Sequence, residues 1–120
     1  MEEKNSPLFD LNKALEMVDQ DKDFLKELMG TFKSDYPQKL AAIYQAIQEK
    51  DFETLNEVAH ALKGAAGTLF LNKIYELTLE LEKRGKENKI EGVEEIYKEL
   101  EEELEKFRVF ISQPGWKEKI

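Results

Sequence analysis

The sequence predicts an all-α protein: an up-down-up-down four-helix bundle with a short leading N-terminal helix. Apolar residues recur at helical spacing in four long segments, and no segment alternates with the period of a strand. Short connections separate these segments, which favours antiparallel packing of sequential helices. Only three prolines and six glycines interrupt the pattern, as is typical of a helical domain.

The length of 120 residues predicts a single domain with one core. We expect a flexible N-terminus over 1–7, the helical bundle over 8–112 and a C-terminal tail over 113–120. The net charge of −8 argues against a nucleic-acid partner, and the absence of cysteine excludes disulfides and zinc–thiolate sites. No apolar run reaches the roughly 20 residues of a membrane span, so we expect a cytoplasmic protein without membrane contact.

The first half of the chain predicts a short helix and then a long one. Asp10 is a good N-cap for a helix over about 10–19, and Asp21 is a good N-cap for the next helix. The apolar positions of this second helix keep helical spacing as far as Ile47. Pro37 removes one amide, but the apolar stripe keeps its phase across it, which predicts one kinked helix rather than two.

The third long segment begins at Asp51, another N-cap residue, and is expected to run to about Ala66 or Gly67. Gly67 and Thr68 then form a plausible turn, after which helical spacing resumes at Leu71.

The last two helices are separated by residues that tolerate a left-handed backbone. Gly85 and Asn88 are expected to stop the fourth segment. The final helix shows apolar spacing from Val93 to Ile111 and is expected to end before Pro114.

The sequence lacks the common motifs of nucleotide-binding and hydrolytic sites. It has no Walker-type phosphate loop, no dinucleotide-binding glycine pattern and no nucleophile elbow. Glu57 and His60 match one Glu-x-x-His pair, but a ferritin-like di-metal site needs two such pairs and the chain has one histidine. We therefore expect neither a metal ion nor a cofactor on this chain.

The single histidine, His60, lies on the polar face of the third segment, opposite its apolar arc. A neutral imidazole is a nucleophile, and the ammonium of Lys63, one turn on, can stabilise an anion attached to it. Gly64 leaves space beside the ring, although glycine in a helix costs about 0.8–1 kcal/mol relative to alanine. The alternative is that Gly64 and Gly67 allow close helix packing while His60 is an ordinary surface residue.

The residues around the histidine form the pattern His60-x-Leu62-Lys63-Gly64-x-x-Gly67. An amphipathic helix that ends in Leu81-Glu82 follows it. Over residues 8–112 the chain resembles histidine-containing phosphotransfer (HPt) domains, including the phosphoacceptor domain of chemotaxis-type histidine kinases. The resemblance implies that His60 accepts and donates a phosphoryl group, that Lys63 supports it and that Gly64 clears room. It also implies that Glu82 orients the imidazole through its second nitrogen.

The resemblance further implies a phosphorelay carrier with no autonomous catalytic centre. Its partners would be a response-regulator receiver domain, a hybrid histidine kinase or both, with Mg²⁺ held by the receiver. Because a helix face that presents a nucleophile suits docking across a receiver surface, we expect the partner to dock over Asn56, Lys63 and Gly67. The alternatives are a kinase phosphoacceptor domain, a helical bundle that docks without being phosphorylated and a metal-dependent hydrolase. Phe70 departs from the small residue that the family commonly has there, and the sequence leaves open whether Trp116 docks.

Overall fold

The computed structural model describes residues 10–119, and all the regular structure among them is helical. This confirms the predicted all-α class. The predicted flexible segment 1–7 lies outside the described residues. The elements in chain order are α1 (Leu11–Met17), α2 (Lys22–Glu49), α3 (Phe52–Thr68), α4 (Asn72–Glu87), α5 (Val93–Ser112) and the 3₁₀ helix η1 (Trp116–Lys119).

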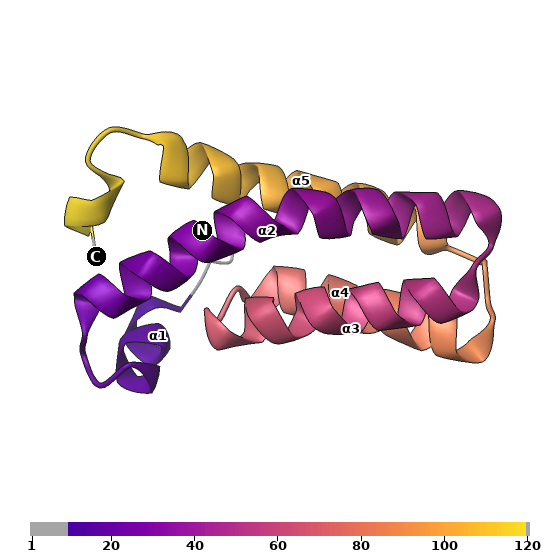
Figure 1. Cartoon of the computed structure of the whole chain (residues 1–120), viewed down its shortest axis with the longest axis horizontal. Coiled ribbons are helices and arrows are strands. Elements are labelled where there is room, and N and C mark those ends of the chain that lie inside the picture. Colours follow the sequence, from indigo (N-terminus) through magenta and orange to yellow (C-terminus); the bar gives the residue numbers. More distant parts are fainter. Residues whose placement is uncertain (1–9, 120) are drawn as a thin grey trace, which may run out of the picture.

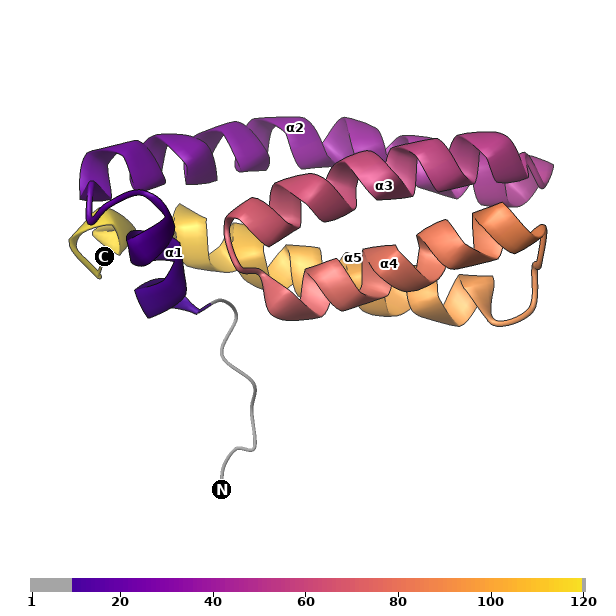
Figure 2. The same ribbon diagram turned by 90° about the horizontal axis from the view of Figure 1, so that it is seen from below.

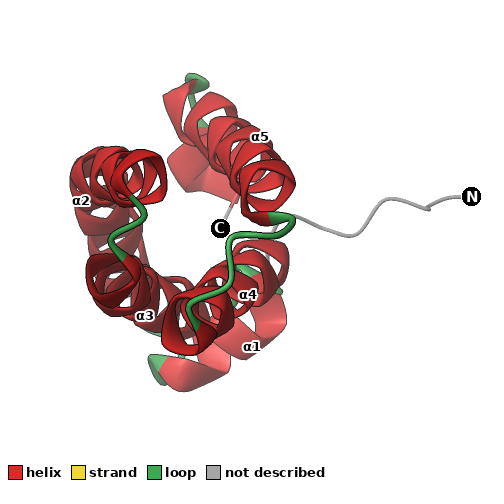
Figure 3. Cartoon of the chain, turned by 90° about the vertical axis from the view of Figure 1, so that its right-hand side faces the viewer, coloured by secondary structure: helices red, strands yellow, loops and turns green. Residues whose placement is uncertain are grey.

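The four long helices lie side by side, and the chain reverses its direction at each short connection between them (Figures 1 and 2). Viewed along the helices, α2, α3, α4 and α5 surround a common core in that order (Figure 3). The short helix α1 lies at the end of the molecule where α2 begins. None of the helices in the described part of the chain is long and apolar enough to cross a membrane.

Three aspartates cap the helices as predicted. Asp10, Asp21 and Asp51 each accept a hydrogen bond from the backbone N–H three residues on, at 3.2, 3.0 and 3.1 Å. Helix α1 is shorter than predicted and ends at Met17. The chain turns there because Asp19 adopts a left-handed backbone with a φ of 52°, which interrupts helical hydrogen bonding.

Helix α2 continues through Pro37, which confirms one long helix rather than two. Proline has no N–H, so the carbonyl of Lys33 lacks its usual intrahelical donor. Figure 1 shows the axis of α2 changing direction between its two halves, as expected for a helix with an internal proline.

The turn between α3 and α4 lies two residues beyond its predicted place at Gly67 and Thr68. Thr68 is still helical, and the left-handed residue is Phe70, with a φ of 56°. The N–H of Phe70 bonds to the Gly67 carbonyl at 3.1 Å, and the N–H of Leu71 bonds to the Ala66 carbonyl at 3.0 Å. This is a Schellman closure with phenylalanine in the position that usually holds glycine.

The predicted stop residues of α4 have different roles. Asn88 is the left-handed C-cap, with a φ of 56°, as expected. Gly85, however, lies inside the helix, where an added Cβ would stand 2.7 Å from the backbone nitrogen of Asn56 and 2.8 Å from the Phe52 carbonyl oxygen. Gly85 is therefore a point of close backbone approach between α3 and α4, and its prediction as a stop residue was wrong.

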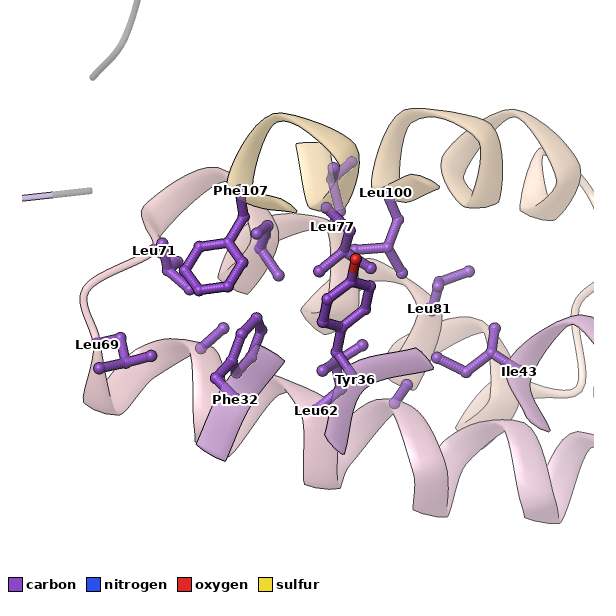
Figure 4. Packing of buried hydrophobic residues seen from close by; sticks show 14 of the residues in the cluster. Phe32, Tyr36, Ile43, Leu62, Leu69, Leu71, Leu77, Leu81, Leu100 and Phe107 are labelled. Carbon is purple, nitrogen blue, oxygen red and sulfur yellow. The ribbon is translucent and has the colours of Figure 1, made fainter. Parts of the chain in front are cut away.

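Large aromatic side chains fill the core between α2 and α5 (Figure 4). The fully buried Phe107 packs edge-on against Phe32, with ring centroids 5.1 Å apart, and against Tyr36 at 6.5 Å. At the end of α5, Trp116 of η1 packs on Phe110, with ring centroids 6.3 Å apart. The tryptophan of the C-terminal tail thus docks on the last helix.

Candidate functional site

Helix α3 presents His60 to solvent, with 66% of its side chain exposed. The opposite side of α3 is buried in the core at Leu55, Ala59, Leu62 and Ala66. The helical periodicity of the sequence therefore placed this histidine on the correct face. An imidazole with this exposure is accessible to a large reaction partner.

Glu82 of α4 reaches across to His60, with its Oε2 atom 2.7 Å from the imidazole Nδ1. The carboxylate is mostly covered, with 16% of the side chain exposed. The ammonium of Lys63 holds the pKa of Glu82 below its ordinary value of 4.5, burial opposes this, and the hydrogen bond with His60 lowers the pKa further. Glu82 is thus an anion at neutral pH and accepts the Nδ1 proton, which leaves the lone pair of a neutral imidazole on Nε2.

Lys63 forms the third part of this cluster. Its Nζ lies 2.7 Å from Glu82 Oε1, and only 17% of its side chain is exposed. Glu82 Oε1 is itself buried, so this ammonium is the group that compensates its charge. The structure therefore brings together three of the residues that the sequence singled out: His60, Lys63 and Glu82.

Sequence reasoning missed Tyr75, in the first turn of α4. The ring centroid of Tyr75 lies 6.0 Å from Lys63 Nζ. Tyr75 precedes Glu82 by seven residues, or two helical turns, and so shares its face of α4. This spacing was the signal that could have found it.

The two glycines that the sequence left open between packing and function differ in their surroundings. An added Cβ at Gly64 would meet nothing within 4 Å, so Gly64 leaves open space one turn from His60. An added Cβ at Gly67 would stand 3.2 and 3.3 Å from two ring carbons of Tyr75, so Gly67 does allow close packing. The packing alternative therefore applies to Gly67 and fails for Gly64.

The remaining expected site residue, Asn56, lies one turn before His60 and is half-buried. Its backbone is the part of α3 that Gly85 approaches. Among residues 10–119 no group of three or more histidine, cysteine, aspartate or glutamate side chains is arranged to hold a metal ion.

Comparison with known proteins indicates one family and its fold. A family model described as "Hpt domain" matches residues 27–109. The crystal structure of histidine-containing phosphotransfer protein B (HptB) from Pseudomonas aeruginosa PAO1 matches with a TM-score of 0.83, covering 97% of this chain and 99% of that chain. At 20% identity this likeness shows a shared fold. No curated protein matches the sequence significantly.

Proposed function

The chain belongs to the Hpt domain family, and we propose that Nε2 of His60 is the atom that carries the phosphoryl group. As a phosphotransfer domain the chain is a phosphoryl carrier in phosphorelays. The observation that supports His60 as the carrier is the state of its imidazole ring. The ring is exposed, and because Nδ1 bonds to Glu82, the nucleophilic Nε2 is free to react. It is also the only histidine of the sequence.

In the proposed reaction, Nε2 attacks the phosphorus of an aspartyl phosphate on a receiver domain. The N–P bond forms as the bond from phosphorus to the aspartate oxygen breaks, and the aspartate leaves as a carboxylate. The imidazole keeps its Nδ1 proton and gains positive charge, which the Glu82 carboxylate 2.7 Å away stabilises. Because the ring is then a good leaving group, the phosphoryl group can pass to a second receiver aspartate by the reverse step.

Lys63 and Gly64 support this step in different ways. The ammonium of Lys63, held beside the ring by Glu82, neutralises part of the charge on the phosphoryl oxygens. Gly64 leaves space for those oxygens and for the incoming receiver. Positioning and charge stabilisation are the main contributions that a protein makes to phosphoryl transfer, so this small set is sufficient for a carrier.

We propose a response-regulator receiver domain, a hybrid histidine kinase or both as partners, docking over the α3 face that includes Asn56 and Gly67. The receiver is expected to supply the Mg²⁺ ion, and the domain to act in the cytoplasm with these partners. We further propose that α2 to α5 are arranged as an up-down-up-down four-helix bundle. The reversal of direction at each connection in Figures 1 and 2 supports this arrangement.

Incubation with a phosphorylated receiver, followed by mass measurement and acid treatment, tests the carrier role. We expect a gain of one phosphoryl group that acid removes, because phosphohistidine is acid-labile. The His60→Gln variant should gain none and should lose less than about 0.5 kcal/mol of stability, as is usual for an exposed position. Receiver binding without labelling would instead indicate a bundle that only docks.

A further inference from the structure

Tyr75 lies beside the site on α4, and 38% of it is exposed. Its ring centroid is 6.0 Å from Lys63 Nζ, at the outer range of a cation–π contact. The ring of Tyr75 therefore faces Lys63 and the backbone of α3 at Gly67. An exposed aromatic ring against a cation of the site calls for an explanation beyond the filling of the core.

Gly67 provides the second observation. An added Cβ at Gly67 would lie 3.2 and 3.3 Å from the Cδ1 and Cε1 atoms of Tyr75, so the ring rests directly on the α3 backbone. A side chain at Gly67 would push the ring outward. Gly67 and Lys63 are four residues apart and lie on the same face of α3, so the glycine makes room for the ring next to the lysine stem.

The state of Lys63 completes the argument. A surface lysine normally keeps its ammonium in water, but here only 17% of the whole side chain is exposed. The ammonium lies 2.7 Å from Glu82 Oε1 and 6.0 Å from the centroid of the Tyr75 ring. The carboxylate attracts the charge, whereas the ring limits the directions in which the stem can turn.

We propose that Tyr75 is a positioning residue for phosphoryl transfer, holding the Lys63 ammonium beside Glu82 and His60. The inference rests on the proposed function. When a phosphoryl group is attached to His60, its oxygens compete with Glu82 for the ammonium. The ring keeps the ammonium within reach of both anions, so that Lys63 meets the phosphoryl group without first losing the rotamer freedom of a free lysine.

Two substitutions at Tyr75 test whether its ring positions the Lys63 ammonium or only covers the surface of the protein. Tyr75→Leu removes the π-face but keeps an apolar side chain, while Tyr75→Phe keeps the face and removes only the hydroxyl. The protein is loaded with phosphoramidate, a small phosphoryl donor, and the lifetime of phosphohistidine is followed. Tyr75→Leu should shorten the lifetime about two- to fivefold, the factor that corresponds to an exposed cation–π contact. Tyr75→Phe should retain most of the wild-type lifetime.

Two controls link the effect to the lysine. Tyr44→Leu, which removes another exposed tyrosine outside the site, should leave the lifetime unchanged. Tyr75→Leu should have no further effect in a Lys63→Ala background. The NMR signals of the Lys63 methylene protons give a readout that needs no phosphorylation, since the ring current shifts them upfield in the wild type and in Tyr75→Phe but not in Tyr75→Leu.

The outcomes distinguish the two proposals. If phosphoramidate and a phosphorylated receiver both fail to label wild-type His60, the carrier role is wrong. The positioning role of Tyr75 is then wrong too, even if the Lys63 methylene signals show the contact with the Tyr75 ring. If His60 is labelled but the lifetimes of the three proteins are equal, the carrier role stands and Tyr75 is only surface cover. An equal loss in Tyr75→Phe and Tyr75→Leu would also overturn the positioning role.

Discussion

The interface between α3 and α4 differs in kind from the interface between α2 and α5. The first is a contact of backbones, because an added Cβ at Gly85 would stand 2.7 Å from the Asn56 nitrogen. The second is a contact of large rings, in which Phe107 meets Phe32 and Tyr36. Further along, residues of α2 and α5 line a groove of about 380 Å³, where the ring centroids of Tyr44 and Tyr97 lie 5.5 Å apart.

This difference corresponds to where the site lies. His60 and Lys63 come from α3, whereas Glu82 and Tyr75 come from α4, so every contact of the cluster crosses the close interface. Two backbones in contact can approach no further, and they fix the distance that the Glu82 side chain must span. The α2–α5 interface carries none of these residues, and its spacing is set by side chains. We infer that α3–α4 packing controls the chemistry and that α2–α5 packing mainly controls stability.

The largest expected effect comes from emptying the ring interface. Phe107→Ala should destabilise the fold by about 3–5 kcal/mol, because it leaves a cavity where a fully buried ring stood. The folded molecules should keep the Nδ1–H tautomer of His60. Denaturant unfolding measures the loss, and ¹⁵N NMR of the single imidazole reads the tautomer. Phe107→Leu provides a milder version for the same measurements. A changed tautomer in the folded protein would contradict the proposed separation of roles.

Gly85→Ala should affect the His60 tautomer more, and stability less, than Phe107→Ala does. The new Cβ must push α3 and α4 apart, at a cost of about 1–3 kcal/mol. The stability loss is smaller than for Phe107→Ala, but the His60–Glu82 contact should weaken and the Nδ1–H tautomer should lose population. Thermal melts and the same ¹⁵N spectra test both expectations.

Gly30→Ala is the matched control, because an added Cβ there would meet nothing within 4 Å. It should raise stability by about 0.5–1 kcal/mol without affecting the imidazole. An unchanged imidazole in Gly85→Ala would show that the carboxylate side chain can absorb the shift, and that backbone contact does not set the site.

Local sequence patterns were sufficient to predict much of the fold. The caps at Asp21 and Asp51 depend on hydrogen bonds that span three residues, so the sequence alone predicted them. The turn after α3 was misplaced because the left-handed residue is Phe70, a choice that no local preference favours. Its ring packs against the core, and its carbonyl accepts a hydrogen bond from the Asp10 N–H at 3.1 Å. These contacts are non-local.

The same division applies to the site. His60, Lys63 and Gly64 share one helix, so helical spacing alone placed them together. Glu82 was identified through a family resemblance, since nothing in the spacing shows how α4 is rotated against α3. Tyr75 was missed because its seven-residue spacing from Glu82 becomes informative only once Glu82 is known to face the site. The close approach at Gly85 was likewise invisible, because it exists only once two helices have been paired.

Gly64 combines a small expected change in stability with the clearest separation of stability from function. Gly64→Ala should raise stability by about 0.5–1 kcal/mol, since the glycine is exposed, lies inside a helix and would give an added Cβ no neighbour within 4 Å. Transfer should slow mildly in Gly64→Ala and severely in Gly64→Gln, because a longer side chain fills the space beside His60. Melting curves and receiver-to-His60 transfer rates on both variants test this. If both variants are destabilised while transfer per folded molecule is unchanged, Gly64 is a packing residue like Gly85, and the open space beside the imidazole has no function.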